Sequence, residues 1–135
     1  MKILISIALL AVLWAHTVVA GPTGDDAVAA GQAWLKLVDD KDYAGSWAGA
    51  GTLFQSGVSE DRWVAMVKSI RERLGDLRSR TFDAVTLTKS LPGVPDGDYA
   101  IVRFQTVYEK KAESMETITL VLEDGIWKAG GYYIK

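Results

Sequence analysis

The apolar residues of this chain recur first at helical spacing and later at alternate positions. Between residues 27 and 74, apolar side chains return every three or four residues, which is the period of a helix with one buried face. From Arg78 onward apolar and polar residues alternate, which is the period of a strand with one face toward a core. The pattern therefore predicts helices in the first part of the chain and an antiparallel sheet in the second.

Two helices have clear boundaries. Residues 27–40 carry a buried face and follow Thr23 and Asp25, either of which can act as the N-cap. Residues 59–75 begin at the N-cap Ser59 and end at Gly75, with arginines in the last turn. The apolar face of this second helix consists of Trp63, Met66, Val67, Ile70 and Leu74.

A glycine-rich stretch, DYAGSWAGAG at residues 42–51, lies between these helices. Asp42 is a suitable N-cap, and Tyr43 and Trp47 are four residues apart, so both rings project from one side of a short helix. The other side, made by Ala44, Gly45, Ala48 and Gly49, is nearly bare. We interpret the stretch as a helix pressed closely onto a neighbour, with the Trp47 indole N–H bound to a fixed partner. A ligand cleft lined by both rings is the alternative.

Four strands are expected at residues 80–91, 99–111, 114–124 and 126–135. The first connection, PGVPDGD, cannot continue a sheet interior, and Asp124-Gly125 is typical of a two-residue hairpin turn. Gly130-Gly131 predicts a bulge in the last strand. The fold class is therefore α+β, with two to three N-terminal helices packed on a curved four-stranded antiparallel meander. The nearest shape is the cone of the cystatin-like and nuclear-transport-factor-like folds, which host enzymes, carriers and dimerisation modules.

The N-terminus has the organisation of a secretory signal peptide. Lys2 precedes an apolar run from Ile3 to Trp14, and small residues lead to Ala20. We expect cleavage after Ala20, which leaves residues 21–135 as one domain in the periplasm or outside the cell. The run is shorter than the ~20 residues of a comfortable membrane span, although an uncleaved anchor is the alternative.

Removal of the leader limits the available chemistry. The chain has no Cys, and its one His, His16, lies in the leader. Zinc sites of the usual kind, Ser–His–Asp triads and disulfides are therefore excluded from residues 21–135, and we expect no metal or cofactor. The net charge of −2 gives no reason to expect nucleic-acid binding.

A set of aromatic, apolar and charged positions resembles the family known as domain of unknown function 4019. The resemblance covers most of residues 21–135 and is densest in the helices. It is carried by Trp34-Leu35, Val38-Asp39, Tyr43, Ser46-Trp47, Phe54, Val58, Trp63, Arg71, Leu74-Gly75 and Arg80. It implies a small, secreted, bacterial protein, and it brings no activity, substrate or catalytic residue.

Arg71 lies beside the apolar stripe of its helix, where a guanidinium is partly buried and requires a carboxylate. We predict that it clamps this helix to the preceding ones through Asp39 or Asp42; the alternative is an arginine that holds an anionic ligand in a cavity. The basic residues of this part of the chain, Arg71 included, are interpreted as a solvated helix end. These are Lys68, Arg71, Arg73, Arg78 and Arg80.

These features favour a non-enzymatic module that binds a protein or a small apolar ligand, with Tyr43, Trp47, Trp63 and Arg71 as candidate ligand-binding residues. One alternative is a small enzyme or carrier with an apolar pocket and Asp/Tyr chemistry. Its candidate residues on the strands are Asp83, Tyr99, Tyr108, Tyr132 and Tyr133. The other alternative is a homodimer formed through the outer sheet face, which would contain Gln105, Val107, Thr117, Thr119 and Val121.

Overall fold

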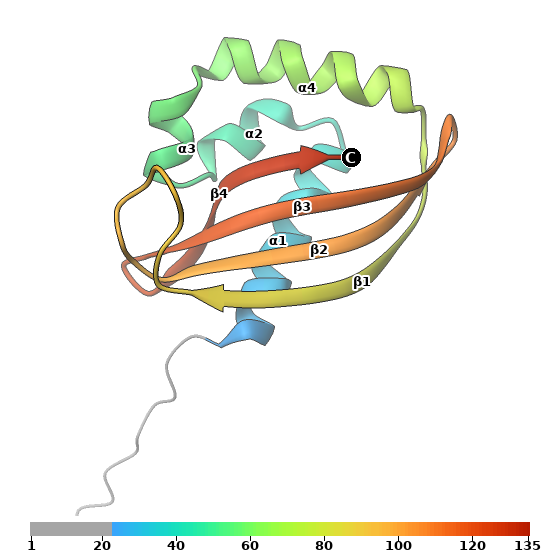
Figure 1. Ribbon diagram of the computed structural model, residues 1–135. Helices are drawn as coiled ribbons and strands as arrows, with labels where there is room; N and C mark the ends of the chain where they lie inside the picture. The colour runs from blue at the N-terminus through green and yellow to red at the C-terminus, as the bar shows by residue number, and fades with distance from the viewer. Residues whose placement is uncertain (1–22) are drawn as a thin grey trace, which may run out of the picture.

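The computed structural model describes residues 23–135, and the predicted leader lies outside this range. Four helices precede four strands, which confirms the α+β class (Figure 1). The helices are α1 (Gly24–Asp39), α2 (Tyr43–Ala48), α3 (Thr52–Gly57) and α4 (Glu60–Leu74). The strands are β1 (Leu77–Thr88), β2 (Tyr99–Tyr108), β3 (Lys111–Glu123) and β4 (Ile126–Ile134).

The strands form one antiparallel meander in the order β1-β2-β3-β4. Asp124 and Gly125 both adopt positive φ, of 50° and 78°, as the predicted two-residue hairpin requires. The register between β3 and β4 shifts between Thr119 and Leu120, opposite Gly130, which confirms the expected bulge. Strand β1 begins three residues earlier than the sequence predicts, because residues 77–79 also pair with β2.

The helices lie together on one side of the curved sheet, with α1 crossing behind the strands and α4 beyond β4 (Figure 1). Helix α1 begins with a capping box between Thr23 and Asp26, and it buries Trp34, Leu35 and Val38. Gly31 permits its close approach to the sheet, since a Cβ there would lie 3.3 Å from the Ile118 side chain. The face of β2 opposite the predicted outer face is buried throughout: Ala100, Val102, Phe104, Thr106 and Tyr108.

The glycine-rich stretch differs from the prediction in one respect. Asp42 is the N-cap of α2, as expected, but Ala44, Ala48 and Gly49 are exposed and do not face a neighbouring helix. The side that packs contains Tyr43 and Ser46. The Ser46 hydroxyl donates to the Tyr43 carbonyl and accepts from the Trp63 indole, and the Ser46 carbonyl accepts from the Trp34 indole. A second short helix, α3, follows the stretch, and the sequence pattern does not indicate it.

The residues proposed above for dimerisation alternate with the core residues of β2 and β3, and one of them, Val121, lies against Gly51 at the start of α3. The register places Thr117 opposite Arg103 and Tyr133, and Val121 opposite Tyr99 and Lys128. Thr117 and Val121 are buried, whereas Gln105 is exposed. Only part of the predicted outer face is therefore accessible.

Candidate functional site

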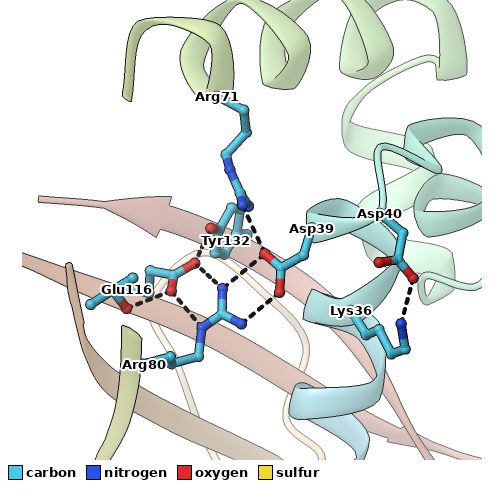
Figure 2. A network of polar contacts seen from close by, with 8 residues as sticks. Lys36, Asp39, Asp40, Arg71, Arg80, Glu116 and Tyr132 are labelled. Atoms are coloured by element: carbon cyan, nitrogen blue, oxygen red, sulfur yellow. Dashed lines mark hydrogen bonds and ion pairs between the residues drawn. The ribbon is translucent and has the colours of Figure 1, made fainter. Parts of the chain in front are cut away.

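Four charged side chains meet where the helices cover the sheet. Asp39 is the last residue of α1, Arg71 lies in the last turn of α4, Arg80 in β1 and Glu116 in β3. We call these four residues the ion-pair network (Figure 2). They converge because Arg80 and Glu116 occupy inward-facing positions of the sheet, while the ends of α1 and α4 approach the same region.

The Arg80 guanidinium lies between the two carboxylates. Its Nη1 and Nη2 donate to Asp39 over 2.7 and 3.1 Å, and its Nε and Nη2 donate to Glu116 over 2.7 and 3.2 Å. Glu116 is fully buried, and it also accepts hydrogen bonds from the hydroxyls of Thr106, at 2.5 Å, and Tyr132. This carboxylate thus has four donor groups around it, which compensate for its removal from water.

Arg71 completes the network and confirms the predicted clamp. Its Nη2 donates to Asp39 Oδ1 over 2.8 Å, so the partner is Asp39, whereas Asp42 caps α2. The guanidinium carbon lies 5.2 Å from the centre of the Tyr108 ring, a cation–π distance. Nη1 is buried and has no hydrogen-bond acceptor among the described residues.

The network fixes the protonation states of its members. Burial alone would raise the pKa of Asp39, but the hydrogen bonds from Arg80 and Arg71 outweigh it and hold that pKa below its ordinary value. The pKa of Glu116 is lowered in the same way, with burial opposed by Arg80, Thr106 and Tyr132. Burial and the Glu116 charge raise the pKa of the Tyr108 and Tyr132 hydroxyls. At neutral pH both carboxyl groups are therefore ionised, both tyrosines are neutral, and the four charges of the network cancel.

An apolar slot opens beside the network, between α4 and β4. The α4–β4 slot has a volume of about 190 Å³. It is lined by Trp63, Met66, Val67, Ile70, Arg71, Tyr132, Tyr133 and Ile134. At its rim, 46% of Met66 and 59% of Tyr133 are exposed to solvent. Arg71 is the one charged residue in this lining.

The wall of the slot is a rigid aromatic cluster. The Trp63 ring contacts Trp34, Phe54 and Tyr132 at centroid distances of 5.8, 4.8 and 6.4 Å. Ser46 holds both tryptophans: its hydroxyl accepts from the Trp63 indole over 2.9 Å, and its carbonyl accepts from the Trp34 indole over 2.8 Å. The shape of this wall is therefore set by buried hydrogen bonds as well as by packing.

A second pocket lies on the other side of Arg71. It has a volume of about 230 Å³ and a more polar lining. Its residues are Val38, Asp39, Lys41, Tyr43, Arg71, Glu72, Gly75, Asp76 and Leu77. Arg71 thus borders both cavities and separates the polar pocket from the apolar slot.

The structure divides the four candidate ligand-binding residues among different places. Trp63 and Arg71 line the α4–β4 slot, and Tyr43 lines the second pocket with Arg71. Trp47 lines neither cavity. Its indole donates to the Val58 carbonyl over 2.8 Å, which agrees with the packing interpretation.

Sequence reasoning missed half of the network. The charge pattern predicts a solvated basic segment that includes Arg80, yet the Arg80 side chain is only 14% exposed because two carboxylates bind it inside the fold. Glu116 was not considered, although it shares the inward alternation of Ile118 and Leu120. That alternation was a usable signal for Glu116, whereas the partner of each charge depends on the strand register.

The described residues hold no group of three or more His, Cys, Asp or Glu side chains arranged to bind a metal ion. Over the same range, no helix is long and apolar enough to cross a membrane.

Comparison with known proteins identifies the fold and a family. The model of a family described as "Protein of unknown function (DUF4019)" matches residues 30–132. No curated protein matches the sequence. Among solved structures, Aln2 from a Streptomyces species is similar, with a TM-score of 0.52 and 14% identity over 86% of this chain and 93% of that one.

Two further structures carry the name of the nuclear-transport-factor-like fold. One is provisionally described as an NTF2-like transpeptidase from Campylobacter jejuni, with a TM-score of 0.51 and 14% identity over 79% of this chain and 97% of that one. The other is an NTF2-like protein of unknown function from Silicibacter pomeroyi, with a TM-score of 0.50 and 16% identity over 84% of this chain and 100% of that one. At these identities the similarity establishes the fold, which is the cone expected from the sequence.

Proposed function

The chain belongs to the DUF4019 family of proteins of unknown function, and we propose that it is a non-enzymatic binding module that holds a small apolar ligand in the α4–β4 slot. The observation that carries this proposal is the combination of an open apolar slot with a neighbouring network whose charges are already paired.

The paired charges argue against acid–base catalysis at this place. A general base works best when its pKa lies near the working pH and its lone pair is free. The pKa values of Asp39 and Glu116 are lowered, and those of Tyr108 and Tyr132 are raised. Each shift moves the group away from neutral pH, as expected for a structural network.

The size and lining of the slot suit a compact apolar group. A cavity of about 150 Å³ lined by apolar side chains is known to accept benzene, and the slot measures about 190 Å³. Binding would also cover Met66 and Tyr133, the exposed apolar residues at its rim. A ligand group of about one aromatic ring therefore fits the space.

NMR titration of the labelled protein with small aromatic probes tests this function. Probes should shift the signals of slot residues, and Ile70→Trp, which fills the slot, should abolish the shifts. Ala65→Trp is the matched control, because Ala65 is exposed on the same helix and does not line the slot. Thermal melts establish that both variants fold. Equal binding by wild type and Ile70→Trp would refute the slot as the binding site.

We also propose that the protein is exported and works in the periplasm or outside the cell. Support comes from the basic, apolar and small-residue order of residues 1–20. Mass spectrometry of the protein from its native host should find a chain that begins at Gly21. An intact Met1 would contradict export by cleavage.

A further inference from the structure

The guanidinium of Arg71 has one edge without a protein acceptor. Its Nη2 binds Asp39, but Nη1 has no hydrogen-bond partner within residues 23–135, although only 8% of the side chain is exposed. A buried donor without an acceptor costs free energy, so native structures rarely keep one without a reason. Arg71 borders both the α4–β4 slot and the more polar second pocket. Nη1 itself has almost no accessible surface, so an acceptor atom on a ligand in the slot would satisfy this donor after a small turn of the guanidinium.

The guanidinium of Arg71 is held on two sides before any ligand arrives. Asp39 holds one side of the guanidinium, and the Tyr108 ring lies against its face. Asp39 is itself held by two hydrogen bonds from Arg80. A preorganised donor in an apolar site favours a ligand with one acceptor at a defined distance from its apolar part.

The charges nearby decide what kind of acceptor fits. Asp39 and Glu116 already balance Arg71 and Arg80, so the network is neutral as it stands. A carboxylate placed at Nη1 would add an unbalanced negative charge close to Asp39 in a poorly hydrated site, which is unfavourable. A carbonyl oxygen accepts the same hydrogen bond from a charged donor without adding charge.

We infer that the ligand of the α4–β4 slot is an uncharged carbonyl compound, with a ring-sized apolar group against Trp63 and its carbonyl oxygen on Arg71 Nη1. This inference rests on the proposed binding function and specifies the class of ligand. Ketones, esters and amides share the required chemistry, and a blocked aromatic amino acid would present it as a peptide does.

Three probes of similar shape separate the contributions of the aromatic ring, the neutral carbonyl group and a negative charge to binding. Acetophenone has a phenyl ring and a neutral carbonyl, ethylbenzene lacks the oxygen, and benzoate replaces the ketone with a carboxylate. NMR titrations of the full mature chain give the dissociation constant of each. Acetophenone should bind about tenfold or more tightly than ethylbenzene, the size expected for a hydrogen bond to a charged donor. It should also bind more tightly than benzoate.

Arg71→Lys tests the donor itself. Lysine can keep a cation on Asp39 but has no second nitrogen to donate into the slot. The variant should lose the preference for acetophenone over ethylbenzene. Arg73→Lys is the control, since Arg73 is exposed on the same helix and outside the slot, and it should keep the preference.

A final arm compares acetophenone with N-acetylphenylalanine amide, because tighter binding of the latter identifies a peptide as the source of the carbonyl.

Equal binding of ethylbenzene and acetophenone would overturn the inference and leave the slot as an apolar site. Tightest binding by benzoate would overturn the preference for a neutral acceptor. Slot signals that no probe shifts would remove the proposed function as well. If Arg71→Lys does not fold, the three titrations of the wild-type protein still show whether the slot prefers a neutral carbonyl compound.

Discussion

Arg80 in the edge strand and Asp39 at the end of α1 are joined by two parallel hydrogen bonds, of 2.7 and 3.1 Å. This pair connects the sheet to the first helix across 41 residues of chain. The same guanidinium also binds the fully buried Glu116, so Arg80 is the one residue on which both carboxylates of the network depend.

Replacement of Arg80 by Met should destabilise the protein strongly. The change would leave Glu116 buried without a cation, and removal of one partner of a buried pair costs about 3–5 kcal/mol. Arg78→Met is the matched control: Arg78 lies two residues away, is 59% exposed, and forms a 3.6 Å pair with Glu109 that should contribute less than about 1 kcal/mol. Urea unfolding at pH 7 measures both. Similar losses in the two variants would mean that the Arg80 pairs are as weak as surface pairs.

Trp63 in α4 and Trp47 in α2 should differ in their contribution to the free energy of unfolding. Trp63 is 4% exposed, and its truncation to Ala should cost about 3–5 kcal/mol. Trp47 is half-buried, so its truncation to Ala should cost less, about 1–3 kcal/mol, although the indole hydrogen bond to Val58 is lost. Thermal or urea unfolding gives the order. A larger loss at Trp47 would show that the α2–α3 corner, rather than the aromatic cluster, supports the core.

Gly45 is constrained by the N-cap of its own helix. A Cβ at this position would lie 2.2 Å from the Asp42 carboxylate, which accepts a hydrogen bond from the Gly45 N–H. Alanine should gain about 1 kcal/mol of helix propensity and lose a similar amount by displacing the cap. We therefore expect almost no net change for Gly45→Ala, and a stabilisation of about 1 kcal/mol when it is introduced into Asp42→Ala. A double-mutant cycle by urea unfolding measures this coupling, and additive effects would contradict the cap explanation.

The lowered pKa values of Asp39 and Glu116 predict a loss of stability in acid. A group whose pKa is lower in the folded state contributes stability above its unfolded pKa, near 4, and this contribution disappears as the pH falls through the folded value. Glu116→Gln imitates the protonated form, so it should be less stable than wild type at pH 7. The difference between the two proteins should then narrow below about pH 4. A difference that is constant from about pH 7 to about pH 3 would show that the ionisation of Glu116 contributes nothing.

The periodicity of the sequence predicts which side chains face inward, but not which of them meet. Alternation along β2 identified a fully buried face, and the same alternation along β3 includes Glu116. The pairing of Glu116 with Arg80 depends on the offset between strands. Two irregularities in the β1–β2 register, at Leu77/Ser79 and Phe82/Ala84, contribute to that offset, and no residue type in β1 marks them.

The ion pair of Arg71, unlike that of Glu116, could be predicted from local sequence spacing. It lies beside the apolar stripe of α4, and carboxylates close the preceding long helix, so local spacing was enough to predict the clamp. The short helix α3 was not predicted because six residues with few apolar positions give too little periodicity, and its N-cap Gly51 makes no side-chain capping bond. Its position is fixed instead by Glu123, which accepts hydrogen bonds from Thr52.

The network joins partners that lie 32, 36 and 41 residues apart along the chain. Contacts of such separation require closure of long loops, so we expect them to form late, after the local helices and hairpins. Interactions that are absent from the transition state for folding act on the rate of unfolding rather than on the rate of folding. We therefore expect the ion-pair network to slow unfolding. Arg80→Met should unfold faster than wild type in stopped-flow experiments, while its refolding rate should be nearly that of wild type.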